Sequence, residues 1–380
     1  MPSYPLLLKP ASSNCNLSCT YCFYKDKHRL YFPSTQVHRM PDVVLEHVIR
    51  TYMQTDQETY IFTWQGGEPL LMGLEFYKKI IGFQSQYGRK GARVANGVQT
   101  NATLINAKSS RFFRKYQFLL GCSLDGPAWI HNQYRRNRHN QPSHQLVLKG
   151  LEHLKKNSAQ FNILVLVTQA NVHAAGVIYD YLVKQGFCYQ QYIPCVEFDK
   201  NGALCDFAIT GEEWGRFICQ IFEKWQAHDI FSVSIRNFDS ILSKIVDNNT
   251  DICAMSDTCC QYLVVEHNGD VYPCDFFVRP QYRMGNIMSD SWQDLLTSDV
   301  YRNFGAQKSD VNNACKKCSY LYLCNGDCLK HRIYNNHQSD NKSWLCDGWD
   351  HFFEFALGRF EQIADKIRAC RRQSLSKLIR

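Results

Sequence analysis

The stretch Cys15-Asn-Leu-Ser-Cys19-Thr-Tyr-Cys22 carries the strongest signal in this chain of 380 residues. It spaces three cysteines as C-x3-C-x2-C just after the first β-rich run, and no fourth cysteine stands nearby. Structural zinc takes four ligands, whereas three thiolates suit a cubane iron-sulfur cluster that keeps one iron open. The open iron can hold a substrate or cofactor through non-protein atoms. The spacing therefore predicts a reactive cluster.

Six short β-rich runs alternate with helical patterns from Tyr4 to about Cys195. The runs are Pro5–Lys9, Tyr60–Trp64, Ala92–Gln99, Phe118–Ser123, Phe161–Val167 and Tyr189–Pro194. Apolar residues at helical spacing, such as Val44, Val48 and Tyr52, predict the intervening helices. Six β/α units predict a parallel sheet with helical crossovers, either an open wound sheet or a barrel. The polar loops 65–69, 99–101 and 124–127 follow strands, so we expect them to converge on the site.

The second half of the chain lacks this alternation of strands and helices. Residues 196–250 predict a connector with two helices, of which Glu212–His228 is the clearer. From Cys253 to Cys346 the cysteines are dense and turns are frequent, which favours a small domain stabilised by metal clusters that its cysteines bind. Trp349–Arg368 predicts a closing amphipathic helix. The expected domains are residues 1–196, 197–252, 253–348 and 349–380.

Composition excludes several classes of protein. With 45% hydrophobic and 21% charged residues the chain is not wholly disordered, and it lacks the run of about 18 apolar residues that a membrane helix needs. The N-terminus MPSYPLLLKP has no signal-peptide pattern, so we expect a cytoplasmic protein in which metal binding, and not disulfides, explains the high count of 18 cysteines. The net charge of +8 is spread along the chain, and its denser runs at 134–139 and 368–380 indicate solvated surface. We expect neither nucleic acid nor membrane as a partner.

A second group of cysteines permits two complete four-thiolate sites. Its members are Cys253, Cys259, Cys274, Cys315, Cys318, Cys324, Cys328 and Cys346. The pair Cys315-x2-Cys318 taken alone is equally compatible with a zinc knuckle, and Cys260 is an alternative ligand to Cys259. Seven cysteines remain outside the three sets, and most are expected to be inert buried thiols: Cys122, Cys188, Cys195, Cys205, Cys219, Cys260 and Cys370.

The ordered motifs resemble a known family. The first cysteine run, with Tyr21 before its last cysteine, resembles the signature of radical S-adenosylmethionine (SAM) enzymes. Gly269-x4-Cys274, followed by C-x2-C-x5-C-x3-C and Cys346, resembles the SPASM extension with two auxiliary [4Fe-4S] clusters. More narrowly, KPASSNCNLSCTYCFY, FTWQGGEPLL, QTNATLI, SLDGP and VVEHNGDVYPCDFFV resemble anaerobic sulfatase-maturating enzymes. The resemblance runs from about Leu8 to Cys346. It implies an α/β fold: a partial (β/α)6 radical SAM barrel, a small cysteine-rich SPASM domain and a C-terminal helix.

The resemblance also implies roles for individual residues. Cys15, Cys19 and Cys22 would hold the cluster that binds SAM; Cys253, Cys259, Cys274 and Cys328 would hold the first auxiliary cluster, and Cys315, Cys318, Cys324 and Cys346 the second. SAM would be contacted by Tyr21, Gly66, Gly67, Ser123, Arg135 and the backbone at Val196. Asp275 would accept the substrate proton, and Tyr24 and Gln65 would touch the substrate peptide. Glu68 and Asp125 are expected to orient loops or the cofactor, and Ala102 departs from the glycine of many relatives.

The activity implied by the resemblance is oxidation of a cysteine or serine of an unfolded sulfatase polypeptide to Cα-formylglycine. A 5′-deoxyadenosyl radical would remove a Cβ hydrogen, and a flavodoxin or ferredoxin-type protein would supply the electron. Two alternatives remain open at this point. A SPASM-type maturase of another ribosomal peptide would share all eleven cluster cysteines, and a non-enzymatic zinc or electron-transfer protein would explain the closed cysteine sets.

Overall fold

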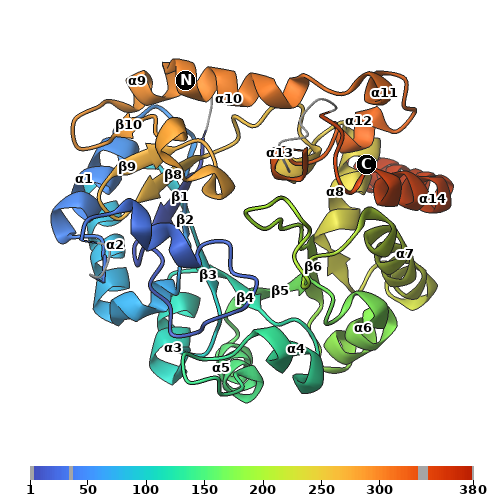
Figure 1. The fold of residues 1–380 in the computed structure, drawn as a ribbon, viewed down its shortest axis with the longest axis horizontal. Helices are drawn as coiled ribbons and strands as arrows, with labels where there is room; N and C mark the ends of the chain where they lie inside the picture. The colour runs from blue at the N-terminus through green and yellow to red at the C-terminus, as the bar shows by residue number, and fades with distance from the viewer. Residues whose placement is uncertain (1–3, 34–36, 333–340, 379–380) are drawn as a thin grey trace. The chain divides into compact units, whose positions relative to one another are not determined.

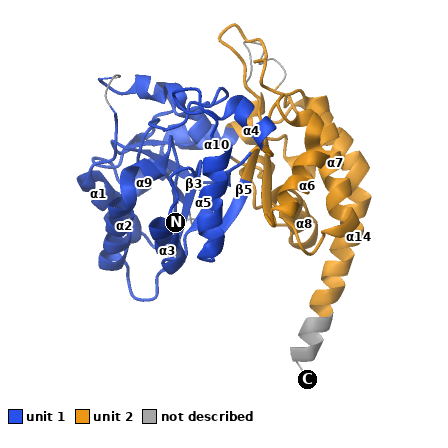
Figure 2. Ribbon diagram, turned by 90° about the horizontal axis from the view of Figure 1, so that it is seen from below, with its two compact units in different colours: residues 1–124, 128–163, 259–306 blue, residues 125–127, 164–258, 307–380 orange. Residues whose placement is uncertain are grey.

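The computed structural model describes residues 4–33, 37–332 and 341–378, which form two compact units (Figure 2). Unit 1 contains residues 1–124, 128–163 and 259–306, and unit 2 contains residues 125–127, 164–258 and 307–380. Each unit is thus assembled from segments far apart in the chain. The predicted four-domain division follows other boundaries and stays a prediction.

The core of unit 1 is a sheet in which four strands run parallel in chain order (Figure 1). These strands are β1 Leu6–Lys9, β2 Thr59–Trp64, β3 Arg93–Thr100 and β4 Leu119–Ser123. Burial alternates along β2, where the side chains of Tyr60, Phe62 and Trp64 are fully buried. This period of two is the pattern of a strand whose one face packs against a core. The predicted strands are confirmed to within one residue at each end.

Helices connect these strands, as the predicted crossovers require. The helices of unit 1 are η1 Lys25–Leu30, α1 Asp42–Met53, η2 Pro69–Met72, α2 Gly73–Tyr87, α3 Ala107–Lys115, α4 Ala128–Tyr134, α5 His144–Lys156, η5 Asp275–Phe277, η6 Pro280–Tyr282 and α9 Trp292–Thr297; α10 Asp299–Ser309 begins there. In α1, Val44, Val48 and Tyr52 are all buried, which confirms the helical pattern read from the sequence. α3 begins with a capping box in which Asn106 and Ser109 satisfy each other's backbone amides.

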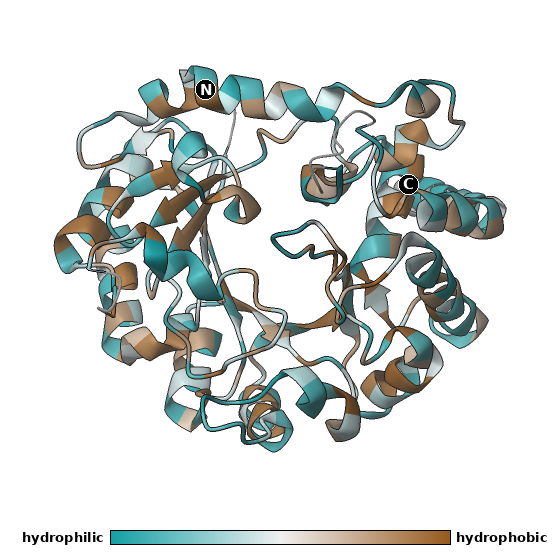
Figure 3. Cartoon of the chain, viewed as in Figure 1, coloured by the Kyte–Doolittle hydropathy of each residue, from teal (hydrophilic) through white to brown (hydrophobic). Residues whose placement is uncertain are grey.

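Three further strands extend the sheet of unit 1 from the cysteine-rich segment. They are β8 Leu263–Glu266, β9 Asp270–Tyr272 and β10 Gly285–Asn286. β8 pairs parallel with β1 and places Glu266 opposite Lys9, while β9 turns back antiparallel to β8. The turn between them holds Gly269 at φ +90°, a backbone conformation that favours glycine. Arrows around β1 and β8 are drawn mainly in the hydrophobic colour in Figure 3, as expected for strands buried on both faces.

Unit 2 combines the end of β5 with two more strands and a group of helices. Its elements are β5 Gln160–Val167 (from Leu164 onward), η3 Val172–Ala174, α6 Ala175–Lys184, β6 Tyr189–Pro194, α7 Gly211–His228, β7 Ser234–Ile235, α8 Arg236–Asp247, η4 Cys253–Met255, α11 Asn313–Lys316, α12 Leu321–Cys324, α13 Leu329–Arg332 and α14 Cys346–Leu378. α7 packs along α14 through glycines: a Cβ on Gly348 would stand 1.9 Å from the Gly211 carbonyl oxygen. The closing helix is confirmed, but it begins three residues earlier than predicted and continues to Leu378.

Among the described residues, no helix has both the length and the apolar character that a membrane crossing requires.

Candidate active site

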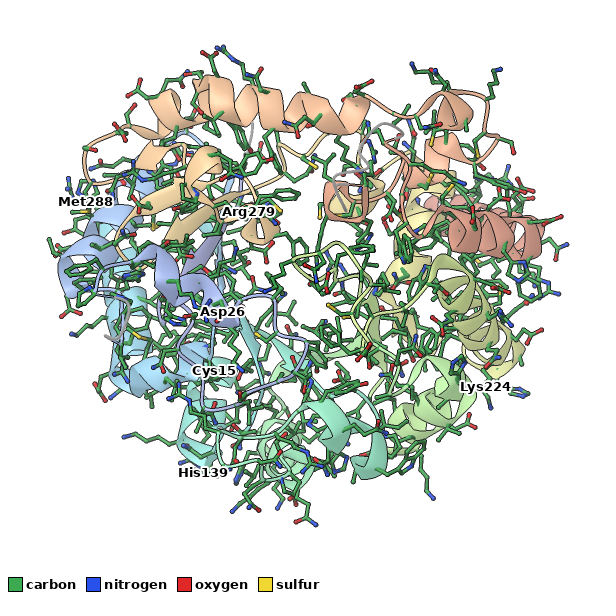
Figure 4. All side chains as sticks on the ribbon, viewed as in Figure 1. Cys15, Asp26, His139, Lys224, Arg279 and Met288 are labelled. Carbon is green, nitrogen blue, oxygen red and sulfur yellow. The ribbon has the colours of Figure 1, made fainter. Side chains whose placement is uncertain are left out.

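The three cysteines of the first motif line one cavity of unit 1. Cys15, Cys19 and Cys22 surround a space of about 800 Å³, and Figure 4 labels Cys15 on the loop that follows β1. Burial raises the pKa of the Cys15 thiol to about 12, and the charge of Glu68 adds to the shift. Such a thiol stays protonated at neutral pH unless a metal replaces its proton. Three thiols on one cavity are the donor set that an open iron-sulfur cluster requires.

Two glycines after β2 hold the cysteine loop in place. Gly67 donates its N–H to the Ser12 carbonyl at 2.7 Å, and the Glu68 N–H donates to the Asn14 carbonyl at 2.8 Å. A Cβ on Gly67 would stand 2.0 Å from the Asn14 oxygen, and one on Gly66, which has φ +139°, would stand 2.7 Å from the Ser12 oxygen. Both glycines thus lie close to the chain just before Cys15, and their contact with SAM stays a prediction.

Glu68 orients the neighbouring loops, as predicted. Its fully buried carboxylate accepts hydrogen bonds from the Leu70 N–H at 2.9 Å, the Thr100 hydroxyl at 2.8 Å and the Asn101 N–H at 2.8 Å. Burial raises the pKa of Glu68 to about 7, against the lowering effect of these bonds. Asn101 in turn directs its Nδ2 to the Cys15 sulfur at 3.7 Å. The next residue, Ala102, has φ +62°, which explains why glycine suits that position.

Asp125 also orients a loop: its Oδ1 accepts the Leu166 N–H at 3.0 Å within unit 2. The prediction that Asp125 orients a loop is therefore confirmed.

The predicted SAM contacts Tyr21 and Arg135 meet in unit 1. The Arg135 guanidinium carbon lies 5.3 Å from the centre of the Tyr21 ring, within the range of a cation–π contact. The Ser18 N–H donates to the Arg136 carbonyl at 2.7 Å, so the basic run lies along the cysteine motif. Arg135 is only 8% exposed, and the prediction that the run 134–139 is solvated surface is wrong for this residue.

The other two SAM candidates lie in different units. Ser123 ends β4 in unit 1, and Val196 is buried just after β6 in unit 2. Their joint action on one ligand stays a prediction.

The predicted base and the predicted substrate contacts meet around a residue that the sequence did not reveal. The Lys9 ammonium lies 3.7 Å from Asp275 Oδ2, donates to Gln65 Oε1 at 3.0 Å and stands 4.5 Å from the centre of the Tyr24 ring. The Tyr262 hydroxyl donates to Asp275 Oδ1 at 3.0 Å. Burial lowers the pKa of Lys9, while the charges of Asp275 and Glu266 oppose that shift. A lysine directly after Leu6-Leu7-Leu8 was the available signal, because buried strands rarely end in a charge without a partner.

The four cysteines assigned to the second auxiliary cluster line one cavity of unit 2. Cys315, Cys318, Cys324 and Cys346 surround a space of about 390 Å³. Burial raises the pKa of Cys324 to about 12 and that of Cys346 to about 11. As at Cys15, these thiols would become thiolates by binding metal. The donor set fits a closed four-thiolate cluster.

The other auxiliary set is divided between the units: Cys253 and Cys328 belong to unit 2, and Cys259 and Cys274 belong to unit 1. Within unit 2, the buried Lys308 ammonium donates to the Ala254 carbonyl at 2.9 Å and to the Asp327 carbonyl at 2.6 Å. It thereby ties together the residues next to Cys253 and Cys328. That all four cysteines bind one cluster stays a prediction.

Cys260 and the other cysteines outside the sets differ in burial. The Cys260 thiol donates to the Tyr301 carbonyl at 3.5 Å, and its role as an alternative ligand stays untested. Buried thiols are found, as expected, at Cys122, Cys195 and Cys219, whereas Cys205 is half-buried and Cys188, Cys260 and Cys370 are exposed. The expectation of mostly buried thiols is therefore wrong. In the described part of the chain, no three His, Cys, Asp or Glu side chains have the arrangement needed to hold one metal ion.

Comparisons with known proteins identify the family of this chain. The Radical SAM superfamily matches residues 10–180, and the SPASM iron-sulfur cluster-binding domain matches residues 257–319. A serine-type anaerobic sulfatase-maturating enzyme of Bacteroides thetaiotaomicron is 35% identical over 92% of this chain and 88% of its own length. A cysteine-type enzyme of Clostridium perfringens is 33% identical over 97% of this chain and all of its own length.

A solved structure, native anSMEcpe with bound AdoMet and the Cp18Cys peptide, superposes with a TM-score of 0.89. It is 33% identical and covers 96% of this chain and 99% of its own. This likeness confirms the expected fold class, a radical SAM domain followed by a SPASM domain and a C-terminal helix. With relatives at this identity over almost its full length, the chain belongs to the anaerobic sulfatase-maturating enzymes, a family of SPASM-containing radical SAM proteins.

Proposed function

We propose that this protein oxidises a cysteine or serine of an unfolded sulfatase polypeptide to Cα-formylglycine. The observation that carries the proposal is the meeting of Asp275, Gln65 and Tyr24 around Lys9 in the unit that also holds the three-cysteine cavity. Family membership supplies the reaction class, and these side chains supply a base and polar groups suited to a peptide. Because serine-type and cysteine-type relatives match almost equally well, both residues are candidate substrates.

The cysteine sets fit three [4Fe-4S] clusters, eleven thiolates in all, with the open one at Cys15, Cys19 and Cys22. With SAM bound there, this cluster supplies after one-electron reduction the radical that takes a Cβ hydrogen from the substrate. Tyr21, Gly66, Gly67, Ser123, Arg135 and the Val196 backbone are the residues proposed to hold SAM. The Arg135 guanidinium is suited to pair with a carboxylate, since it presents several N–H donors in one plane.

The protein's own groups move a proton and orient the peptide. Asp275 is proposed to accept the proton of the substrate thiol or hydroxyl as the Cβ–S or Cβ–O double bond forms, and the second electron lost in this step would pass to an auxiliary cluster. A thioaldehyde formed from cysteine would then react with water, which releases sulfide and gives the aldehyde. Asp275 Oδ1 already accepts the Tyr262 hydroxyl, so the carboxylate is held in one orientation. Gln65 has its Oε1 occupied by Lys9, which leaves its Nε2 group to donate to a peptide carbonyl. The Tyr24 ring packs beside the same ammonium and would border the peptide.

The electron donor is proposed to be a flavodoxin or ferredoxin-type protein in the cytoplasm. The reason is chemical, because an open iron-sulfur cluster needs a low-potential one-electron donor and reducing surroundings.

The test is anaerobic reconstitution with iron and sulfide, reduction, and reaction with SAM and a sulfatase-type C-x-P-x-R peptide or its serine counterpart. Mass spectrometry should find an aldehyde in place of the thiol or hydroxyl, together with 5′-deoxyadenosine, on a protein that holds about twelve irons. A protein that takes up zinc in place of iron contradicts the proposal. So does an iron-loaded protein that cleaves SAM and leaves both peptides unchanged while it modifies another ribosomal peptide.

A further inference from the structure

Lys9 occupies an unusual place for a lysine. It is the last residue of β1, a strand flanked by β2 on one side and β8 on the other, and it is 0% exposed. Burying an ammonium group is costly unless opposite charges and hydrogen-bond acceptors compensate for the lost water. A fully buried lysine at the carboxyl end of a central strand therefore needs partners. The end of β1 is also where a parallel β/α sheet places its chemistry.

The partners of Lys9 are three side chains that the proposed reaction uses. Gln65 follows β2, Tyr24 follows the cysteine motif, and Asp275 follows β9, so three separate segments converge on one ammonium group. All of them belong to unit 1. The same nitrogen contacts an amide oxygen, a carboxylate oxygen and an aromatic face. Displacing Lys9 would thus release the base and both proposed peptide contacts at once.

A second buried carboxylate also lies near Lys9. Glu266 stands opposite Lys9 in the β1–β8 register, is 0% exposed and accepts the Tyr24 hydroxyl at Oε1. Its Oε2 has no hydrogen-bond partner among the described residues and lies 3.6 Å from His267 Nδ1. Asp275 is 7% exposed. One buried cation therefore lies among two buried carboxylates, and Tyr24 bridges from the lysine to Glu266.

The aliphatic part of the Lys9 side chain packs against Gly66. A Cβ on Gly66 would lie 3.6 Å from both the Cα and the Cδ of Lys9, an ordinary contact, so the lysine stem passes directly over that glycine. The loop that carries Gln65 and Gly66 thus packs against the same lysine along its length.

A second buried lysine in the chain makes a useful contrast. The Lys308 ammonium is also 0% exposed, but it donates to backbone carbonyls of Ala254 and Asp327. Such bonds fix the path of the main chain. The contacts of the Lys9 ammonium group described above are all with side chains that the proposed reaction uses, so its position determines how those side chains are presented.

From these contacts we infer that Lys9 is a positioning residue for the reaction. It holds the Asp275 carboxylate in line with the substrate thiol or hydroxyl, and it fixes the Gln65 amide and the Tyr24 ring that border the peptide. This inference rests on the proposed function. Its consequence is that Lys9 determines whether each cleavage of SAM ends in formylglycine.

The experiment compares Lys9→Met, Lys9→Arg and the wild type as reconstituted full-length proteins, with 5′-deoxyadenosine and formylglycine measured in the same reactions. A misplacement of about 1 Å can cost about 10²-fold in rate, so we expect kcat for formylglycine to fall about 10²-fold in Lys9→Met. Iron content and SAM cleavage should stay near wild type, so the ratio of 5′-deoxyadenosine to formylglycine rises. Lys9→Arg keeps the cation and should recover part of the coupling, that is, the share of SAM cleavages that end in formylglycine. Lys27→Met is the control, because the Lys27 ammonium on η1 donates to the backbone carbonyl of Val278. Its product ratio should stay at the wild-type value.

The double variant Lys9→Met/Glu266→Gln separates positioning from folding. Removing the second buried charge should restore the thermal stability that Lys9→Met loses, while the coupling stays poor. An unchanged ratio of the two products in either variant overturns the inference, as does recovery of coupling together with stability. The ratio does not depend on how much protein folds. If the wild type itself forms no formylglycine, the proposed function fails; a coupled Lys9→Met protein beside an active wild type refutes this inference alone.

Discussion

Replacing Gly67 with alanine is expected to remove the first cluster while leaving the others. The added Cβ would stand 2.0 Å from the Asn14 oxygen and 2.5 Å from the Asn14 carbonyl carbon. Ordinary contact begins at 3.4 Å, so one of the two backbones must move by about 1.4 Å. Neither neighbour is the flexible end of a side chain. The movement therefore falls on Gly67 or on Asn14, and in either case it changes the contact next to Cys15.

The cost follows from the bonds that cross this contact. Two backbone hydrogen bonds, from Gly67 to Ser12 and from Glu68 to Asn14, would be strained or lost. At about 1 kcal/mol each, with about 1 to 3 kcal/mol for overpacking, the variant should lose about 3 to 5 kcal/mol at this loop. A loop weakened by that amount would hold three cysteines poorly around one cluster.

The assay is iron and sulfide counting after anaerobic reconstitution, followed by thermal unfolding. We expect the iron content to fall from about twelve toward about eight and SAM cleavage to disappear. Gly82→Ala is the matched control, since a Cβ at this position in α2 meets nothing within 4 Å and alanine favours a helix. A Gly67→Ala protein with full iron content and wild-type SAM cleavage would refute the reasoning.

Three further predictions concern the base, a buried acid and the closing helix. Asp275→Asn should keep its iron and slow formylglycine formation by about 10² to 10⁴-fold, as measured by product assay; wild-type turnover would exclude Asp275 as the base. Burial raises the folded-state pKa of Glu68 from 4.5 to about 7, so the stability it contributes is complete below pH 4.5 and is lost as the pH rises through about 7. That difference corresponds to about 3 kcal/mol, and Glu68→Gln should flatten the unfolding free energy over this pH range; parallel pH profiles would contradict the buried-acid account. Gly348→Ala should lower stability by about 1 to 3 kcal/mol, because its Cβ would stand 1.9 Å from the Gly211 oxygen, whereas Gly358→Ala in the same helix has open space and should not; equal melting temperatures would argue against the close helix contact.

Local patterns account for the parts of the fold that were predicted from the sequence. Each of the strands β1 to β4 is a short apolar run bounded by turn residues, so its ends could be read to within one residue. β8 was missed because its pairing with β1 is long-range, and β9 in turn depends on β8, with which it pairs across a short turn. β8 joins the sheet beside β1, more than two hundred residues earlier in the chain, and nothing in the sequence near Leu263 indicates that neighbour.

The site shows the same division between local and long-range information. The C-x3-C-x2-C spacing is local, and it correctly indicated three thiols on one cavity. The importance of Lys9 arises only when the segments carrying Gln65, Tyr24 and Asp275 converge on it. Gly67 illustrates an intermediate case, since close approach was predictable from the residue type but its partner, the Asn14 backbone, was not. Exposure of Cys188 was also missed, because it lies beside apolar Phe187 at a strand entrance.

The most direct test of the central claim follows the Cβ hydrogens of the substrate. A C-x-P-x-R peptide carrying deuterium at both Cβ positions of its cysteine is incubated with SAM, a reductant and the reconstituted protein, and both products are analysed by mass spectrometry. The account predicts that a single deuterium appears in 5′-deoxyadenosine, that formylglycine retains the other, and that the two products form in equal amounts. Formylglycine accompanied by unlabelled 5′-deoxyadenosine, with the deuterium released to water, would contradict it.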